Sequence, residues 1–261
     1  MSKNAAYIEM KHVVFDALDK RRAGNALDEQ SRQMLECAFT AAQQSLQHAN
    51  GDPILHPSDG SPFVMHVLRV ALELVERFAV QDPVAIAGAL AHDIVENGLV
   101  SIHDTAVAGY DDVISISNDL AAMPRERVSG LDLSNTPLTT AGCLAADLDD
   151  AANVARKWEH YQRLLTSSVH SFSPAIKLAD NIVAYGGRYA TTSVRQRQPY
   201  EVALFEAFAE RFPLDSQPLA SQDLRDSIDQ AWAGTANVNA ISKRVELVAE
   251  AARLLEQPFP Y

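Results

Sequence analysis

An apolar segment at residues 83–97, PVAIAGALAHDIVEN, ends in three residues whose side chains could do chemistry. His92, Asp93 and Glu96 lie within one turn if the segment is helical, so they cluster on one face. Burying an ionised carboxylate costs several kcal/mol unless it is paired or ligates a metal. The segment therefore indicates either a metal site or the end of a helix, where polar residues emerge into solvent.

Polar residues also interrupt two other apolar segments. His66 lies within SPFVMHVLRVALELV, and Lys177 and Asp180 lie within AIKLADNIVAY. Each has a structural interpretation by itself. A single histidine on an apolar face is usually a core residue, and Lys177 could neutralise Asp180 without any ligand.

Together these residues offer a donor set for a divalent cation. His66, His92, Asp93 and Asp180 supply two imidazole nitrogens and two carboxylate oxygens. That set suits Mn²⁺, Fe²⁺ or Zn²⁺, with coordination positions left for water. Neighbouring residues on a helix point about 100° apart. His92 and Asp93 can therefore converge on one ion only if the helices that carry His66 and Asp180 complete the site.

The composition excludes several classes of protein. The 261 residues are 47% hydrophobic, enough to form a core without disulfides or a structural metal. A net charge of −12 repels phosphate backbones, so we expect no nucleic-acid partner. No apolar stretch approaches the ~18 residues of a membrane span, and the N-terminus lacks a secretory signal. With only Cys37 and Cys143 as cysteines, we expect a cytoplasmic protein without a disulfide framework or a membrane partner.

Helix-capping residues and apolar spacing predict an all-α helical bundle. Ser61–Pro62, Asp82–Pro83 and Ser173–Pro174 each indicate a helix start. The predicted helices cover, approximately, residues 25–46, 61–79, 83–97, 110–122, 141–167, 173–185, 199–212, 221–233 and 237–256.

The order of these motifs, H…HDxxE…KLAD, resembles the HD-domain metal-dependent phosphohydrolases. More narrowly, it is similar to the alarmone (ppGpp) hydrolase domains of the RelA/SpoT family and to the small alarmone hydrolases. A family segment of the type SGxPYxxHxxxVA stands here as DGSPFVMHVLRVA, residues 59–71. HDxxED stands as HDIVEN, residues 92–97, and KLAD is residues 177–180. The similarity covers roughly residues 30–190.

The resemblance implies a fold, a cofactor and a set of site residues. The implied core is an HD-type unit at 25–197. Outside the similar region we expect an N-terminal helix or arm at 1–24 and a C-terminal helical extension at 198–261 that packs on the core or forms a homodimer interface. Mn²⁺ is the implied metal, with Zn²⁺, Fe²⁺ and Mg²⁺ as alternatives. The implied metal ligands are His66, His92, Asp93 and Asp180. The implied catalytic residues, which activate and orient the attacking water, are Glu96 and Asn97. The implied substrate-binding residues are Phe63, Ser58, Lys177 and Asn181.

The implied reaction is removal of the 3′-pyrophosphate from an alarmone such as ppGpp or ppApp. The chain departs from the family pattern at three places. Asn97 stands where the family has a second acidic residue, Ala184 stands where it has an asparagine, and residues 56–58 lack its basic side chains. Two alternatives therefore stay open: a phosphomonoesterase or phosphodiesterase acting on another nucleotide, and a non-catalytic domain that binds a nucleotide.

Overall fold

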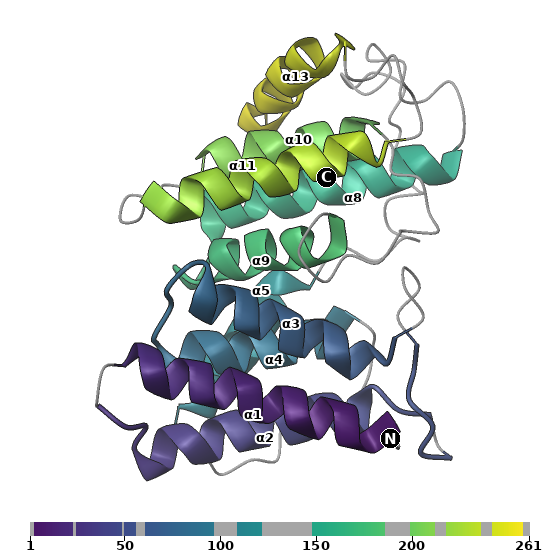
Figure 1. Cartoon of the computed structure of the whole chain (residues 1–261). Helices are drawn as coiled ribbons and strands as arrows, with labels where there is room; N and C mark the ends of the chain where they lie inside the picture. Colours follow the sequence, from purple (N-terminus) through teal and green to yellow (C-terminus); the bar gives the residue numbers. More distant parts are fainter. Residues whose placement is uncertain are drawn as a thin grey trace.

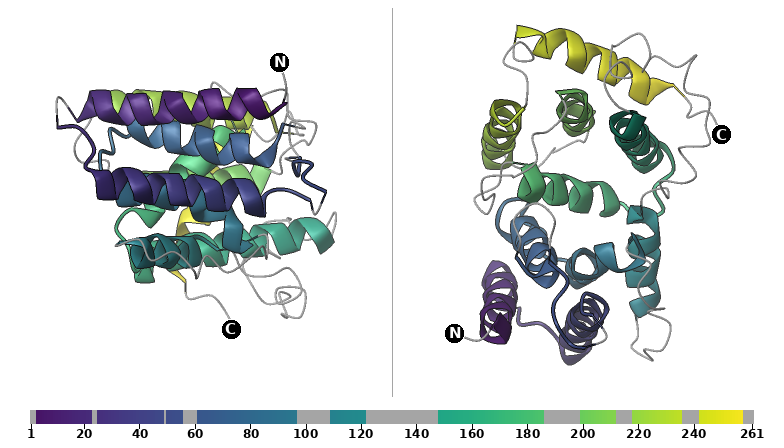
Figure 2. Two further views of the ribbon diagram at one scale, coloured as in Figure 1. Left: turned by 90° about the horizontal axis from the view of Figure 1, so that it is seen from below. Right: turned by 90° about the vertical axis from the view of Figure 1, so that its right-hand side faces the viewer.

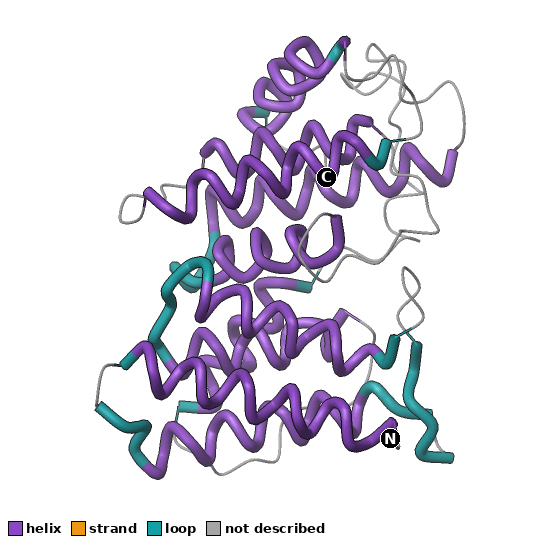
Figure 3. Tube along the Cα trace, in the orientation of Figure 1, coloured by secondary structure: helices purple, strands orange, loops and turns teal. Residues whose placement is uncertain are grey.

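Helices make up the regular structure in the part of the chain that this computed structural model describes. The described residues are 3–22, 25–48, 50–55, 61–96, 109–121, 148–185, 199–211, 218–235 and 242–257. These ranges contain helices and two isolated bridges but no strand, which confirms the all-α prediction (Figure 3). The helices are α1 (Lys3–Arg21), α2 (Glu29–Ser45), α3 (Phe63–Glu76), α4 (Pro83–Glu96), α5 (Tyr110–Leu120), α8 (Leu148–Ser167), α9 (Ser173–Tyr185), α10 (Pro199–Arg211), α11 (Pro218–Ala233) and α13 (Arg244–Glu256).

Helix α9 lies between two groups of helices (Figure 1). On one side α1, α2, α3 and α4 pack against one another, with α5 against α4. On the other side α8, α10 and α11 pack together, and α13 covers α10 (Figure 2). Because α9 contacts α3 and α4 as well as α8, α10 and α11, its residues can reach side chains from both groups. Among the described residues, no helix is both long and apolar enough to cross a membrane.

Most helix starts lie where the sequence predicts them. The side chain of Asp28 accepts a hydrogen bond from the Ser31 amide at the start of α2, and Asp82 accepts one from the Val84 amide at the start of α4. These contacts satisfy amides that a helix start would otherwise leave unpaired. The predicted starts near residues 141 and 237 lie outside the described residues, and α11 begins at Pro218, earlier than predicted.

Helix α3 differs from its prediction at both ends. It begins at Phe63 with Pro62 in the capping position, and no side chain caps it, so Ser61 is not the N-cap. It ends at Glu76, and Ala79 has a φ of 52°, in the left-handed region. The amide of Val80 bonds back to the carbonyl of Leu74, which closes the helix end. The sequence has no glycine at this turn, so the usual signal for a helix end is absent.

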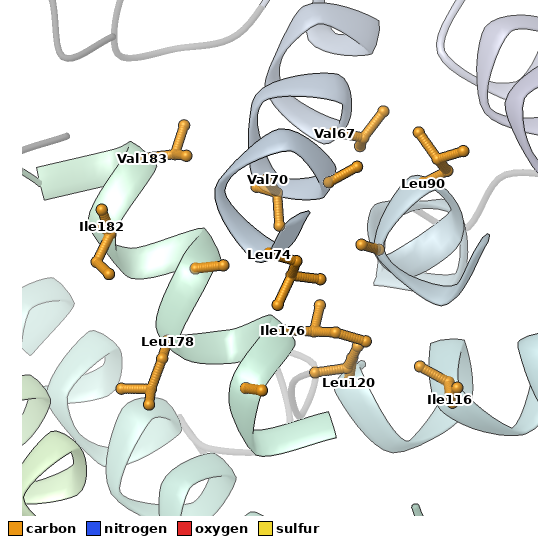
Figure 4. Packing of buried hydrophobic residues seen from close by; sticks show 14 of the residues in the cluster. Val67, Val70, Leu74, Leu90, Ile116, Leu120, Ile176, Leu178, Ile182 and Val183 are labelled. Atoms are coloured by element: carbon orange, nitrogen blue, oxygen red, sulfur yellow. The ribbon is translucent and has the colours of Figure 1, made fainter. Parts of the chain in front are cut away.

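The core fixes how α3, α4, α5 and α9 cross. Figure 4 shows Leu74 of α3, Ile176 of α9 and Leu120 of α5 meeting where these helices converge. All three side chains are buried. This packing holds the helix backbones on either side of the polar residues identified above, so the positions of those residues depend on apolar contacts.

Gly88 lets α4 and α5 approach closely. A Cβ added at Gly88 would lie 2.6 Å from Cγ2 of Ile116. We expect Gly88→Ala to lower the free energy of unfolding by about 1–3 kcal/mol, although alanine is the better helix former. Urea unfolding would measure this loss, and the loss should be smaller in an Ile116→Ala background, which lacks the clashing Cγ2. A Gly88→Ala protein that is more stable than the wild type would contradict the close approach.

Candidate metal centre

Three helices bring one potential metal ligand each to a common point. His66 of α3, His92 of α4 and Asp180 of α9 offer ligand atoms that all lie within 4.8 Å of one another. The distance from His66 Nε2 to Asp180 Oδ1 is 3.0 Å, and that from His92 Nε2 to the same oxygen is 3.9 Å. Both histidines are buried. The structure thus assembles residues that are far apart in the sequence.

His92 is oriented by a backbone contact on one ring nitrogen, so that the other faces the candidate ligands. Its Nδ1 lies 2.7 Å from the carbonyl oxygen of Ala89, and a carbonyl can only accept, so Nδ1 carries the proton. In a neutral imidazole the other nitrogen, Nε2, then presents a lone pair. This Nε2 is buried and makes no hydrogen bond to any described residue. Backbone bonding at one ring nitrogen is the usual way in which proteins orient a metal-ligating histidine.

Asp93 lies beside both imidazoles. Its Oδ2 is 3.3 Å from His92 Nε2 and 3.6 Å from His66 Nε2. Carboxylate oxygens this close to two imidazole nitrogens could share a divalent cation with them. The donor set and the orientation of His92 therefore fit a divalent cation. His66, His92 and Asp180 form the group, and Asp93 lies beside its two histidines.

The charges of the two aspartates act on His66. Burial by itself lowers the pKa of His66, but the hydrogen bond to Asp180 and the charges of Asp93 and Asp180 outweigh it, and the pKa is raised. The rings of His66 and Phe63 lie nearly perpendicular to each other, with centroids 5.8 Å apart. Metal binding would release the proton that His66 shares with Asp180.

Lys177 holds the second oxygen of Asp180. Its Nζ donates to Asp180 Oδ2 over 2.7 Å, one helical turn away on α9. Burial acts to raise the pKa of Asp180, but the charge of Lys177 and the bond from His66 outweigh it, so the pKa lies well below 3.8. Lys177 thus braces Asp180, and a contact from Lys177 to a substrate phosphate stays a prediction.

The structure describes only some of the other predicted site residues. Asn181 is buried, and its side chain accepts from Tyr161 Oη and donates to the carbonyl of Lys177, so it ties α9 to α8. Glu96 is the last residue of α4, but its side chain is outside the description. Asn97 and Ser58 lie outside the described residues.

Helix α8 contributes buried polar residues near α9 that the sequence did not assign to the site. Tyr161 stacks on Phe208 with ring centroids 4.6 Å apart and bonds to Asn181, as expected for a packing residue. His160 is 2% exposed, and burial, Lys177 and Arg163 together hold its pKa well below 6.5. In the sequence, His160 follows Trp158 and Glu159 in an ordinary amphipathic helix. The signal for its burial is its spacing from Leu164, which lies one turn later and is buried.

The neutral ring of His160 predicts a loss of stability in acid. Because its folded pKa is well below 6.5, the unfolded chain binds the proton first. Above pH 6.5 the contribution of His160 to the free energy of unfolding is therefore complete. As the pH falls towards the folded pKa, this contribution is lost by at most about 1.4 kcal/mol per pH unit. Urea unfolding of the wild type and of His160→Gln at a series of pH values isolates this slope. Parallel curves for the two proteins would contradict the assignment.

Comparison of the chain with protein-family models, with curated proteins and with solved structures found no match in any of the three. The case for a function therefore depends on the geometry of the residues themselves. That geometry shows a buried group, His66, His92 and Asp180, that could bind a metal ion.

Proposed function

We propose that the protein is a metal-dependent phosphohydrolase of the HD type that acts on a nucleotide. The most specific form of the proposal is removal of the 3′-pyrophosphate from an alarmone such as ppGpp or ppApp. The observation that carries it is the buried Nε2 of His92, which is oriented by Ala89 and makes no hydrogen bond to a described residue, yet lies beside Asp93 and Asp180. Such an atom calls for a cation, and two imidazoles with two carboxylates suit Mn²⁺.

The bound metal would supply a water of lowered pKa and a Lewis acid for a phosphoryl oxygen. The residues of the chain have separate tasks. Asp180 is held in one orientation by Lys177 on one oxygen and His66 on the other. Glu96 follows His92 by one turn on α4, and we assign it the proton of the attacking water, with Asn97 orienting that water. Phe63, beside His66, offers an aromatic face for the substrate base.

The charge of the centre favours a phosphate substrate only when a metal is bound. His66 and Lys177 lie among the carboxylates of Asp93 and Asp180, so the site by itself has little positive charge to attract an anion. A divalent cation would reverse this balance, which matters in a chain with a net charge of −12. We therefore expect substrate binding to require the metal.

The test is pyrophosphate release from ppGpp and, separately, from ppApp by Mn²⁺-loaded protein. We expect release that depends on Mn²⁺ and disappears on chelation. The faster of the two substrates identifies the base preference. Failure to release pyrophosphate from either compound, with Mn²⁺ bound, would contradict the alarmone form of the proposal. A panel of other phosphate esters would then test the broader form.

Asn97 and Ala184 favour a second candidate, a domain that binds a nucleotide without turnover. Asn97 replaces an acidic residue of the family pattern, and Ala184 replaces an asparagine. In an enzyme, Asn97→Asp should change the rate of pyrophosphate release, because it adds a second carboxylate that can accept a proton from water. If neither the wild type nor Asn97→Asp turns over any nucleotide while both bind it, the non-catalytic function is supported instead.

A further inference from the structure

Tyr161 on α8 and Asn181 on α9 form a buried hydrogen-bonded pair that the proposed chemistry leaves without a role. Tyr161 is 0% exposed and Asn181 is 2% exposed. Tyr161 Oη lies 3.0 Å from Asn181 Oδ1, and Asn181 Nδ2 lies 2.8 Å from the backbone carbonyl oxygen of Lys177. Because a carbonyl can only accept, Nδ2 donates to Lys177, and Oδ1 accepts from the hydroxyl of Tyr161. The direction of both hydrogen bonds is therefore fixed.

The ring of Tyr161 is held in place by two further contacts. It stacks on Phe208 of α10, with ring centroids 4.6 Å apart and an angle of 14° between the planes. The Nζ atom of Lys157, one turn earlier on α8, lies 5.8 Å from the centroid of the Tyr161 ring. A phenol that is stacked along its face and bonded at its tip has little freedom to move. Tyr161 thus presents its hydroxyl to α9 in a fixed position.

The turn of α9 that Tyr161 reaches carries a candidate metal ligand. Asn181 follows Asp180 directly, and its bond to the Lys177 carbonyl spans the same turn over which Lys177 Nζ holds Asp180 Oδ2. Neighbouring residues on a helix point about 100° apart. Asn181 therefore faces α8, while Asp180 faces His66 of α3, 3.0 Å away, on another side of α9 (Figure 1). A rotation of α9 about its axis would move both side chains together, so a bond that fixes Asn181 also fixes the direction of Asp180.

We propose that Tyr161 is a positioning residue of the metal centre, which keeps Asp180 directed at the two histidines by holding Asn181. The apolar contacts around α9 are not directional. A hydrogen bond is directional, and in a buried position it is costly to break. A rotated α9 would break the bond between two buried polar groups, so this bond favours the one orientation in which Asp180 meets His66 and His92. This inference rests on the proposed metal centre.

Tyr161→Phe in the full chain tests the proposal, because it removes the hydroxyl and keeps the ring that stacks on Phe208. Loss of a residue that orients a ligand typically weakens metal binding about 10–100-fold. Since Tyr161 acts through Asn181, we expect the lower end of that range, a Mn²⁺ dissociation constant raised about tenfold in titration calorimetry. The matched control is Tyr7→Phe, which removes the hydroxyl of another buried tyrosine, bonded to Gln43 of α2. Both variants should be less stable in urea, but only Tyr161→Phe should bind Mn²⁺ more weakly.

A double-mutant cycle separates this route from a general loosening of α8. Asn181→Leu replaces the amide with an apolar group of similar shape. In that background Tyr161→Phe should cause no further loss of Mn²⁺ affinity, because the bond is already absent. Two outcomes overturn the proposal: an unchanged Mn²⁺ affinity in folded Tyr161→Phe, or single losses that add up in the double variant.

Proton NMR of the metal-free protein tests the same proposal without Mn²⁺. We expect a nuclear Overhauser effect between the Tyr161 ring and the side-chain amide of Asn181 in the wild type, and its absence overturns the proposal even if a variant does not fold. A second effect, between the His66 ring and the β-protons of Asp180, should weaken in Tyr161→Phe and persist in Tyr7→Phe. If this second effect is unchanged in Tyr161→Phe, the proposal is also overturned. If the wild type binds no Mn²⁺ but shows these results, the proposed function fails while the positioning of Asp180 by Tyr161 stands.

Discussion

Asp180→Ala is expected to abolish Mn²⁺-dependent pyrophosphate release and to weaken Mn²⁺ binding by more than about a hundredfold. The reason is geometric, since Asp180 Oδ1 lies within 3.0 Å of His66 Nε2 and 3.9 Å of His92 Nε2 and joins α9 to the other two helices. Removing a residue that only supports a ligand already weakens metal binding about 10–100-fold. Loss of a ligand itself should cost at least as much.

Thermal and urea unfolding give a readout of the same prediction that does not depend on substrate. A ligand that binds only the folded state adds about 2.7 kcal/mol of stability at a concentration of 100 Kd. We expect Mn²⁺ to stabilise the wild type in this way and to leave Asp180→Ala unchanged. Asp226→Ala, at an exposed position on α11, is the control and should respond to Mn²⁺ like the wild type. Equal stabilisation of Asp180→Ala would show that the ion binds elsewhere.

Arg163→Met is expected to lower the free energy of unfolding by about 3 kcal/mol or more, the usual cost of breaking a buried ion pair from one side. Arg163 lies 3.1 Å from Glu159 and 3.5 Å from Asp119, whose carboxylates are buried. It also donates to the backbone carbonyls of Asp119 and Ala121, which join α8 to the end of α5. Without it, two buried carboxylates lose their cation.

For a chain of this size, that loss corresponds to a melting temperature lower by roughly 6–12 °C, measurable by calorimetry. Arg163→Lys should recover only part of it, because one ammonium cannot reach the acceptors that the guanidinium spans. Arg253→Met is the matched control, since Arg253 is exposed on α13 and its hydrogen bond is to Ala249 on the same helix. A loss no larger than that of Arg253→Met would contradict the role of Arg163.

Local patterns were sufficient to predict most of the helices. Asp82 predicted a helix start because its side chain bonds to an amide two residues later, within reach along the chain itself. The end of α3 could not be predicted in this way. Ala79 adopts a left-handed φ of 52° without being a glycine, so the residue type does not signal the turn.

The candidate ligands could be named from the sequence, but the inward-facing polar residues of α8 could not. His66, His92 and Asp180 are recognisable because each interrupts an apolar helix. His160 and Arg163 lie in a helix with many charged residues, where polar side chains normally face solvent. Only the packing of α8 against α5, α9 and α10 turns these two towards the interior.

By itself, the sequence determined the helical class, the order of the polar residues and the chemistry that their donor atoms permit, because these depend on residue type and on spacing along one helix. The tertiary structure alone decided that His66, His92 and Asp180 share a space less than 4.8 Å across, and that Lys177 braces Asp180. The physical reason is that side chains on one helix diverge by about 100° per residue. Their convergence on a single point therefore depends on how separate helices cross.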